Sequence, residues 1–135
     1  MSIFQWNDSL LTGNALIDSE HKELVRAIND FFDACDRRIS GDEFQKILSF
    51  LNSYTIKHFS DEEQLQVKYD YPYYEDHKKF HESYKTTVRN FMHEFILRGI
   101  NGELVAKAKH DIGEVIIAHI KLEDHRLAAH IKTME

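Results

Sequence analysis

The sequence predicts an all-α protein, an antiparallel up-down-up-down four-helix bundle with an irregular N-terminal arm. The chain of 135 residues contains one proline and five glycines, and long helices tolerate few of either residue. In the segments between the glycines and the proline, apolar side chains recur at steps of three and four residues. This is the spacing of a helix with one face toward a core. Short connections between such long helices favour antiparallel neighbours.

The elements are expected in a simple order within a single domain, residues 1–135. Residues 1–17 should form the arm, with Phe4 and Trp6 packed on the bundle. Asp18 is a suitable N-cap for the first helix, and Pro72 suits the end of one helix and the start of the next. The four helices are expected at about residues 18–38, 42–69, 73–97 and 103–132.

Composition excludes several classes of protein. The single cysteine, Cys35, cannot form an intramolecular disulfide and fits a reducing compartment. A net charge of −6 argues against a nucleic-acid partner, because phosphate binding needs clustered basic side chains. No apolar stretch approaches the roughly 20 residues that cross a bilayer, and the segment MSIFQWNDSL lacks the pattern of a secretory signal. We therefore expect a cytoplasmic protein without membrane insertion.

Histidine is the unusual residue of this chain, which contains nine. In the segment HKKFH, His77 and His81 are four residues apart, so a helix places them on one face, and that face is the apolar stripe. His21, His58 and His119 lie on the apolar stripes of the other three helices. The carboxylate of Glu62 follows His58 by one turn. Each expected helix therefore directs nitrogen or oxygen ligands toward the core.

A single histidine on an apolar stripe is more often a core residue with one hydrogen bond than a metal ligand. Five such histidines with a carboxylate are different, because each unsatisfied buried group costs about 1–3 kcal/mol. A bundle with a stability of about 5–15 kcal/mol could not carry that sum. A bound cation removes the problem, since it requires deprotonated imidazole and carboxylate. A purely structural, metal-free bundle is therefore disfavoured.

The ligand types narrow the choice of metal. Imidazole with carboxylate suits iron, zinc or copper, but this set is too large for one tetrahedral zinc ion. Two metals that share a carboxylate fit better. The Glu-x-x-His pattern of carboxylate-rich di-iron bundles does not occur in this sequence. A histidine-rich, carboxylate-poor centre disfavours strongly oxidising chemistry and suits reversible binding.

Four pieces of the chain together resemble the hemerythrins, in particular the single-domain bacterial kind. They are Trp6 with NDSLLTGNALIDSEHKEL around His21, HFSDEE at 58–63, YP before HKKFH at 71–81, and HIKLED at 119–124. The resemblance implies two iron ions as cofactors. It also implies seven ligands, namely His77, His81 and His119 on one iron, His21 and His58 on the other, and Glu62 and Asp124 as bridges beside an oxo or hydroxo group.

The spacing of one ligand does not agree with a regular helix. Asp124 follows His119 by five residues, which is about 140° around an ideal helix, whereas Glu123 would point closer to His119. Geometry alone favours Glu123, and the resemblance selects Asp124. We follow the resemblance and expect a local irregularity, such as a π-type bulge, at this position.

The resemblance implies reversible dioxygen binding at the open position of the second iron, for oxygen storage, delivery or sensing. Phe59 and Ile116 are candidates for the lining of the dioxygen pocket, which must exclude water, although core packing alone also explains them. The expected partners are dioxygen and an oxygen-accepting protein, and the chain is expected to be a monomer or a weak oligomer.

The alternative is a di-iron enzyme that uses the same site, as a peroxidase or oxidase or as a scavenger of nitric oxide or peroxide. Val115 supports it, because many relatives have a tryptophan there. Leu127 and Gln66 also depart from the family, where tyrosine and methionine are common. Iron storage is a third hypothesis, and the sequence has no second carboxylate-rich site to support it.

Overall fold

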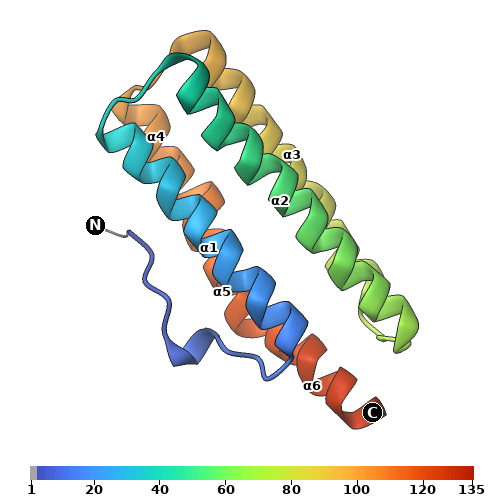
Figure 1. The fold of residues 1–135 in the computed structure, drawn as a ribbon. Coiled ribbons are helices and arrows are strands. Elements are labelled where there is room, and N and C mark those ends of the chain that lie inside the picture. Colours follow the sequence, from blue (N-terminus) through green and yellow to red (C-terminus); the bar gives the residue numbers. More distant parts are fainter. Residues whose placement is uncertain (1–2) are drawn as a thin grey trace.

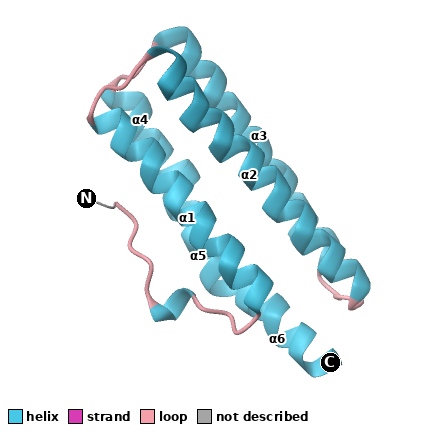
Figure 2. Ribbon diagram, in the orientation of Figure 1, coloured by secondary structure: helices cyan, strands magenta, loops and turns pink. Residues whose placement is uncertain are grey.

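The computed structural model describes residues 3–135, which form four helical rods packed side by side (Figure 1). The first three rods are α1 (Ala15–Asp36), α2 (Gly41–Lys68) and α3 (Tyr74–Arg98). The fourth rod contains α4 (Gly102–Ala108), α5 (Val115–His119) and α6 (His125–Met134). Figure 2 shows helices and loops only within this described part. The expected all-α four-helix bundle is confirmed.

The fourth rod differs from the single helix expected at residues 103–132. Two π-helical segments interrupt it, Lys109–Glu114 between α4 and α5, and Ile120–Asp124 between α5 and α6. Each π turn contains one residue more than an α turn, so it shifts the face that the following residues present. The expected irregularity at Asp124 is confirmed, whereas the first π segment was not predicted.

The start of α1 also differs from the prediction. The helix begins at Ala15, and Asn14 is its N-cap, with its side-chain oxygen 3.0 Å from the backbone nitrogen of Ile17. Asp18, the predicted N-cap, instead accepts hydrogen bonds from the backbone nitrogen and hydroxyl of Thr12 at 2.8 and 2.7 Å. The Asp18 carboxylate therefore anchors the arm to the first turn of α1.

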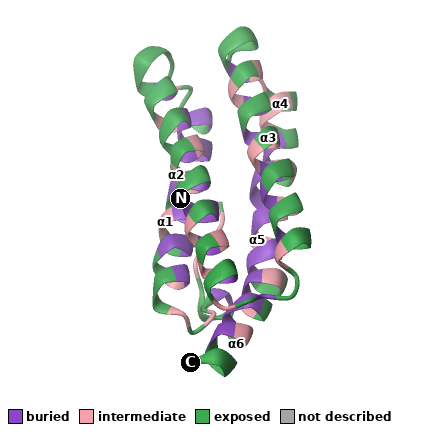
Figure 3. Ribbon diagram, turned by 90° about the vertical axis from the view of Figure 1, so that its right-hand side faces the viewer, coloured by how far each residue is buried: buried purple, intermediate pink, exposed green. Residues whose placement is uncertain are grey.

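The buried faces of the rods meet along the middle of the bundle (Figure 3). The N-terminal arm lies beside α1 in Figure 1 and contains a short 3₁₀ helix, Asp8–Leu10. Phe4 donates its backbone N–H to the Asn29 side chain at 2.9 Å and accepts from the Asn29 amide nitrogen at 2.7 Å. Both Phe4 and Trp6 pack against the core, as expected from the sequence.

Gly113, in the first π segment, lies directly against the arm. A Cβ atom added at this position would overlap the ring of Phe4. The absence of a side chain at this buried residue therefore lets the arm lie directly on the fourth rod. No helix within residues 3–135 is long and apolar enough to cross a membrane.

Candidate metal centre

The structure brings together all seven residues that the sequence analysis selected. They are His21 on α1, His58 and Glu62 on α2, His77 and His81 on α3, His119 at the end of α5, and Asp124 at the end of the second π segment. Every one of these side chains is buried, with at most 5% of its surface exposed. They form two groups of potential ligands, and within each group the ligand atoms lie within 4.8 Å of one another.

Helix geometry explains how the side chains converge. His58 and Glu62 on α2 are one turn apart and face the core together, as do His77 and His81 on α3. The fourth rod achieves the same result with His119 and Asp124, because the π segment between them restores a common face.

Glu123 lies outside the cluster. Its carboxylate is half-buried and lies 3.6 Å from a guanidinium nitrogen of Arg126, whereas Asp124 is buried. The structure therefore turns Asp124, and not Glu123, toward the histidines. Spacing on a regular helix would have selected the wrong residue.

The Glu62 carboxylate lies between imidazoles from three helices. Its Oε2 atom is 3.2 Å from His58 Nε2 and 3.4 Å from His21 Nε2. Its Oε1 atom is 3.1 Å from His81 Nε2 and 3.5 Å from His77 Nε2. Glu62 belongs to both groups of potential ligands, so one carboxylate joins the two halves of the cluster.

The Asp124 carboxylate spans the cluster in the same way. Its Oδ2 atom is 2.8 Å from His21 Nε2, and its Oδ1 atom is 3.0 Å from His77 Nε2 and 3.1 Å from His119 Nε2. Each carboxylate therefore offers one oxygen to each set of imidazoles, which is the arrangement that two metal ions with shared carboxylates require.

These close approaches are not hydrogen bonds. Among residues 3–135, both oxygens of Glu62, both oxygens of Asp124 and the Nε2 atoms of His21 and His81 find no partner in hydrogen-bond geometry. The Nε2 atoms of His77 and His119 face each other at 2.8 Å. Buried polar atoms of this kind cost about 1–3 kcal/mol each. Cations that accept the lone pairs would satisfy them, so the residues present fit a pair of metal ions.

The electrostatics of the cluster favour positive charge. Burial lowers the pKa of His58, but the charge of Glu62 and the hydrogen bond to Glu20 outweigh it and raise that pKa to about 10. Burial likewise lowers the pKa of His77, but the nearby carboxylates of Asp124 and Glu62 outweigh it and raise that pKa to about 9. Burial alone would raise the pKa of Glu62, yet the neighbouring imidazoles hold it well below its usual range. Burial and the charge of Glu62 would raise the pKa of Asp124, yet the imidazoles of His119 and His21 lower it, so both carboxylates stay charged and attract cations.

Two further carboxylates orient the imidazoles from outside the cluster. Glu20 Oε1 accepts from His58 Nδ1 at 2.9 Å, and Glu63 Oε2 accepts from His81 Nδ1 at 2.8 Å. An imidazole that donates from Nδ1 presents the Nε2 lone pair to a metal, and metal-binding histidines commonly have such a partner. Neither glutamate was predicted as part of the site, although Glu20 directly precedes His21 and Glu63 directly follows Glu62 in the sequence.

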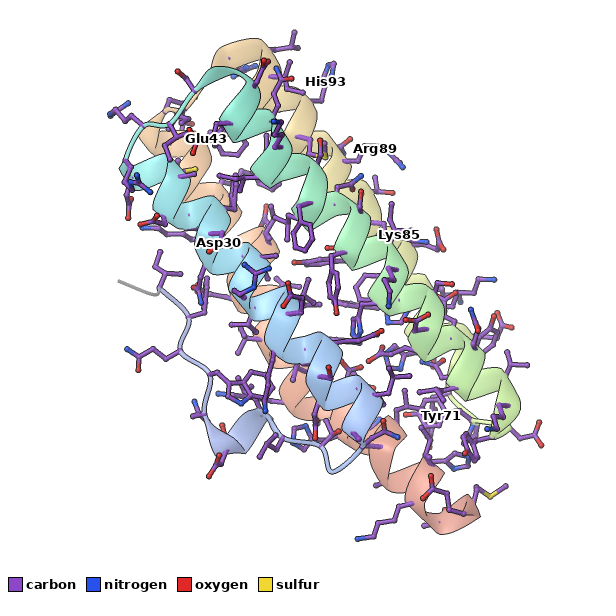
Figure 4. All side chains as sticks on the ribbon, viewed as in Figure 1. Asp30, Glu43, Tyr71, Lys85, Arg89 and His93 are labelled. Atoms are coloured by element: carbon purple, nitrogen blue, oxygen red, sulfur yellow. The ribbon has the colours of Figure 1, made fainter. Side chains whose placement is uncertain are left out.

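Both apolar and polar side chains surround the cluster. Phe59 stacks on His81 with ring centroids 3.8 Å apart, and Ile116 is buried in the same core. Gln66 is fully buried one turn after Glu62, and its amide has no hydrogen-bond partner in the described structure. Tyr71, at the end of the bundle where α2 turns into α3 (Figure 4), has an equally unpaired buried hydroxyl within residues 3–135.

A four-helix bundle that encloses two adjoining groups of histidine and carboxylate ligands defines a class of metal-binding helical protein. Sequence comparison identifies the family within that class. The profile of the hemerythrin HHE cation binding domain matches residues 12–131. The chain therefore belongs to the hemerythrin family, and the resemblance to bacterial hemerythrins is confirmed.

Individual relatives agree with this assignment. The chain is 33% identical over 95 residues to a bacteriohemerythrin of Pseudomonas aeruginosa, a match that covers 70% of this chain and 61% of that protein. It is 29% identical over 125 residues to a myohemerythrin of Sipunculus nudus, which covers 91% of this chain and 89% of the relative. The crystal structure of a hemerythrin mutant superposes with a TM-score of 0.79 at 20% identity, over 97% of this chain and 98% of that one.

Proposed function

We propose that this chain binds dioxygen reversibly at a centre of two iron ions, and so serves oxygen storage, delivery or sensing. The observation that carries the proposal is the pair of buried ligand groups that share Glu62, with lone pairs that no partner in residues 3–135 satisfies. Membership of the hemerythrin family supports iron as the metal and dioxygen as the ligand.

The five imidazoles divide unequally between the two irons. We assign His77, His81 and His119 to one iron, and His21 and His58 to the other. The second iron thus receives one imidazole fewer than the first. This difference would leave room for dioxygen beside His21 and His58.

The two carboxylates act as bridges in this assignment. Glu62 and Asp124 each direct one oxygen toward each set of imidazoles. An oxo or hydroxo group would complete the bridge. When bound, the iron pair supplies the coordination position and the electrons that holding dioxygen requires.

The surrounding residues keep the centre dry and oriented. Glu20 and Glu63 hold two imidazole rings with Nε2 toward the metals. Phe59 and Ile116 form an apolar boundary, and we propose that they line the dioxygen pocket and exclude water. Exclusion of water and protons favours release of dioxygen over its reduction.

An absorption spectrum tests the proposal directly. Chain loaded with ferrous iron should bind two iron ions, show a visible band in air, lose it under argon and regain it in air. In Asp124→Ala, the loss of a bridging ligand should reduce iron binding. Glu123→Ala is the matched control and should keep it, because Glu123 points away from the cluster. Irreversible bleaching in air, or equal iron binding by both variants, would contradict the proposal.

One observation favours a second candidate, a di-iron enzyme that reduces peroxide, nitric oxide or dioxygen. Gln66 and Tyr71 place polar groups beside the cluster, and such groups can bring a proton to it. Val115, which is only half-buried, leaves less bulk near the pocket than a tryptophan would. Steady-state consumption of peroxide or nitric oxide with an electron donor would distinguish this enzyme from a carrier.

Three earlier expectations stay predictions. They are a cytoplasmic location, a monomeric or weakly oligomeric state, and an oxygen-accepting partner protein. Analytical ultracentrifugation of the iron-loaded chain would measure the oligomeric state.

A further inference from the structure

The two π segments of the fourth rod share an unusual feature. In each, a side chain donates a hydrogen bond to a backbone carbonyl oxygen of the segment. The Tyr84 hydroxyl reaches Ile112 O at 2.6 Å in the first, and His125 Nδ1 reaches Ile120 O at 2.7 Å in the second. A π turn displaces the backbone donor by one residue relative to an α turn. Carbonyl oxygens in such a turn therefore benefit from a donor supplied by a side chain.

His125 holds the second π segment at two points. Its backbone N–H is directed to Leu122 O, and its imidazole is directed to Ile120 O. A carbonyl oxygen can only accept, so Nδ1 is the donor in this bond. These contacts enclose the residues just before Asp124, whose position in the cluster depends on the extra residue of the π turn.

We propose that His125 is a positioning residue for Asp124, in that its imidazole stabilises the π turn against an α turn. An α turn would bring position 123, four residues after His119, to the face that Asp124 now occupies. The imidazole thereby determines which carboxylate enters the metal centre. This inference rests on the proposed function in one respect, namely that Asp124 is a metal ligand.

His130 provides a control within the same helix. Its Nε2 atom bonds to a backbone carbonyl oxygen at the same distance, 2.7 Å, but that oxygen belongs to Tyr69 at the end of α2. His125 and His130 are both half-buried residues of α6. Substitution of either removes one similar hydrogen bond, but the bond of His125 goes to the π segment and the bond of His130 goes to Tyr69.

Hydrogen exchange tests the inference with a readout other than iron binding, on the iron-loaded chain and on metal-free chain that circular dichroism shows to be folded. His125→Leu should accelerate exchange of the backbone amides of residues 120–125 roughly fivefold, the effect of losing one hydrogen bond. His130→Leu should leave those amides unchanged and affect the turn after α2 instead. His125→Asn, which keeps a side-chain N–H, should restore part of the protection and remains informative should His125→Leu fold poorly. The same exchange pattern in His125→Leu and His130→Leu, or unchanged exchange at 120–125, would overturn the inference.

Iron retention provides the second measurement. After loading, a chelator should remove iron from His125→Leu roughly fivefold faster than from the unmodified chain, the effect of losing one hydrogen bond, and from His130→Leu at the unmodified rate. Equal rates for both variants would contradict the positioning role. Should the unmodified chain bind no iron, the proposed function fails, and the exchange experiment still decides the role of His125.

Discussion

Helix α2 and the fourth rod perform the same task by different means. Each supplies one imidazole and one carboxylate to the centre of the bundle. Helix α2 does so with His58 and Glu62, four residues apart in a helix that runs from Gly41 to Lys68. The fourth rod uses His119 and Asp124, five residues apart across a π segment. A spacing of four comes with any regular helix, whereas a spacing of five requires a local irregularity and a side chain that stabilises it.

The extra residue of the second π segment changes which of its side chains are exposed to solvent. Leu122 is 60% exposed, although it is a large apolar side chain. After the π segment, Leu127 and Ile131 of α6 return to a buried face. The irregular turn thus places one residue outside the helical pattern, turns Asp124 inward and leaves the pattern of α6 intact.

The largest expected difference is between two single-residue deletions. Deletion of Leu122 should be tolerated, because the segment can then form an α turn with the histidine and aspartate four residues apart. Deletion of the exposed Ser60 in α2 should abolish iron binding, because it rotates Glu62 and the rest of α2 by about 100° relative to His58.

Circular dichroism, chemical unfolding and bound iron per chain measure the outcome of both deletions. We expect a folded, iron-binding protein without Leu122, and a chain without Ser60 that is destabilised by more than about 3 kcal/mol. The comparison between α2 and the fourth rod would fail if the Leu122 deletion were as damaging as the Ser60 deletion.

An intermediate effect is expected in the first π segment. Gly113→Ala should displace the arm, because the new methyl group overlaps the Phe4 ring. We expect a net loss of about 1–2 kcal/mol, since overpacking outweighs the better helix propensity of alanine. Fluorescence of Trp6, the only tryptophan in the sequence, should shift to longer wavelength as the arm moves into solvent.

Phe4→Ala provides the control for this substitution. It removes the ring that the new methyl group would meet, so Gly113→Ala should cost nothing further in the Phe4→Ala background. An additive loss of stability in the double variant would show that Gly113 acts on the helix and not on the arm.

The smallest effect is expected for Tyr84→Phe. It removes the hydroxyl that donates to Ile112 O, and the loss of one buried hydrogen bond should lower stability by about 1 kcal/mol. Burial raises the pKa of Tyr84 far above its usual value, so this bond should persist at alkaline pH. Tyr73→Phe, at a half-exposed position, is the matched control in urea unfolding. Equal effects of the two substitutions would contradict the role of the Tyr84 hydroxyl.

Much of this architecture could be predicted because it depends on local periodicity. The stripe of α1 through His21, Leu24 and Ile28 is buried as expected, and so is the pair His58 and Glu62. Periodicity did not predict Asp124, for which the family resemblance was needed. Predictions from periodicity assume a regular α-helix, and a π turn departs from that geometry over only a few residues.

The features that were missed depend on contacts between distant residues or between competing side chains. The π segment at Lys109–Glu114 is associated with Tyr84 on α3 and with Phe4 on the arm, neither of which adjoins it in sequence. At the start of α1, Asn14 and Asp18 are both able to cap backbone N–H groups. In the structure Asn14 is the N-cap, and Asp18 accepts a hydrogen bond from Thr12. Residue type alone does not determine which of the two side chains is the N-cap.

We propose that cations satisfy the buried imidazoles and carboxylates of this bundle. The most direct test is the midpoint of guanidinium unfolding at neutral pH, measured for the metal-free chain and for the chain saturated with ferrous iron under argon. We predict a markedly higher midpoint with iron, because ligands that bind only the folded state stabilise it. Identical midpoints for the two forms would show that iron does not satisfy these side chains.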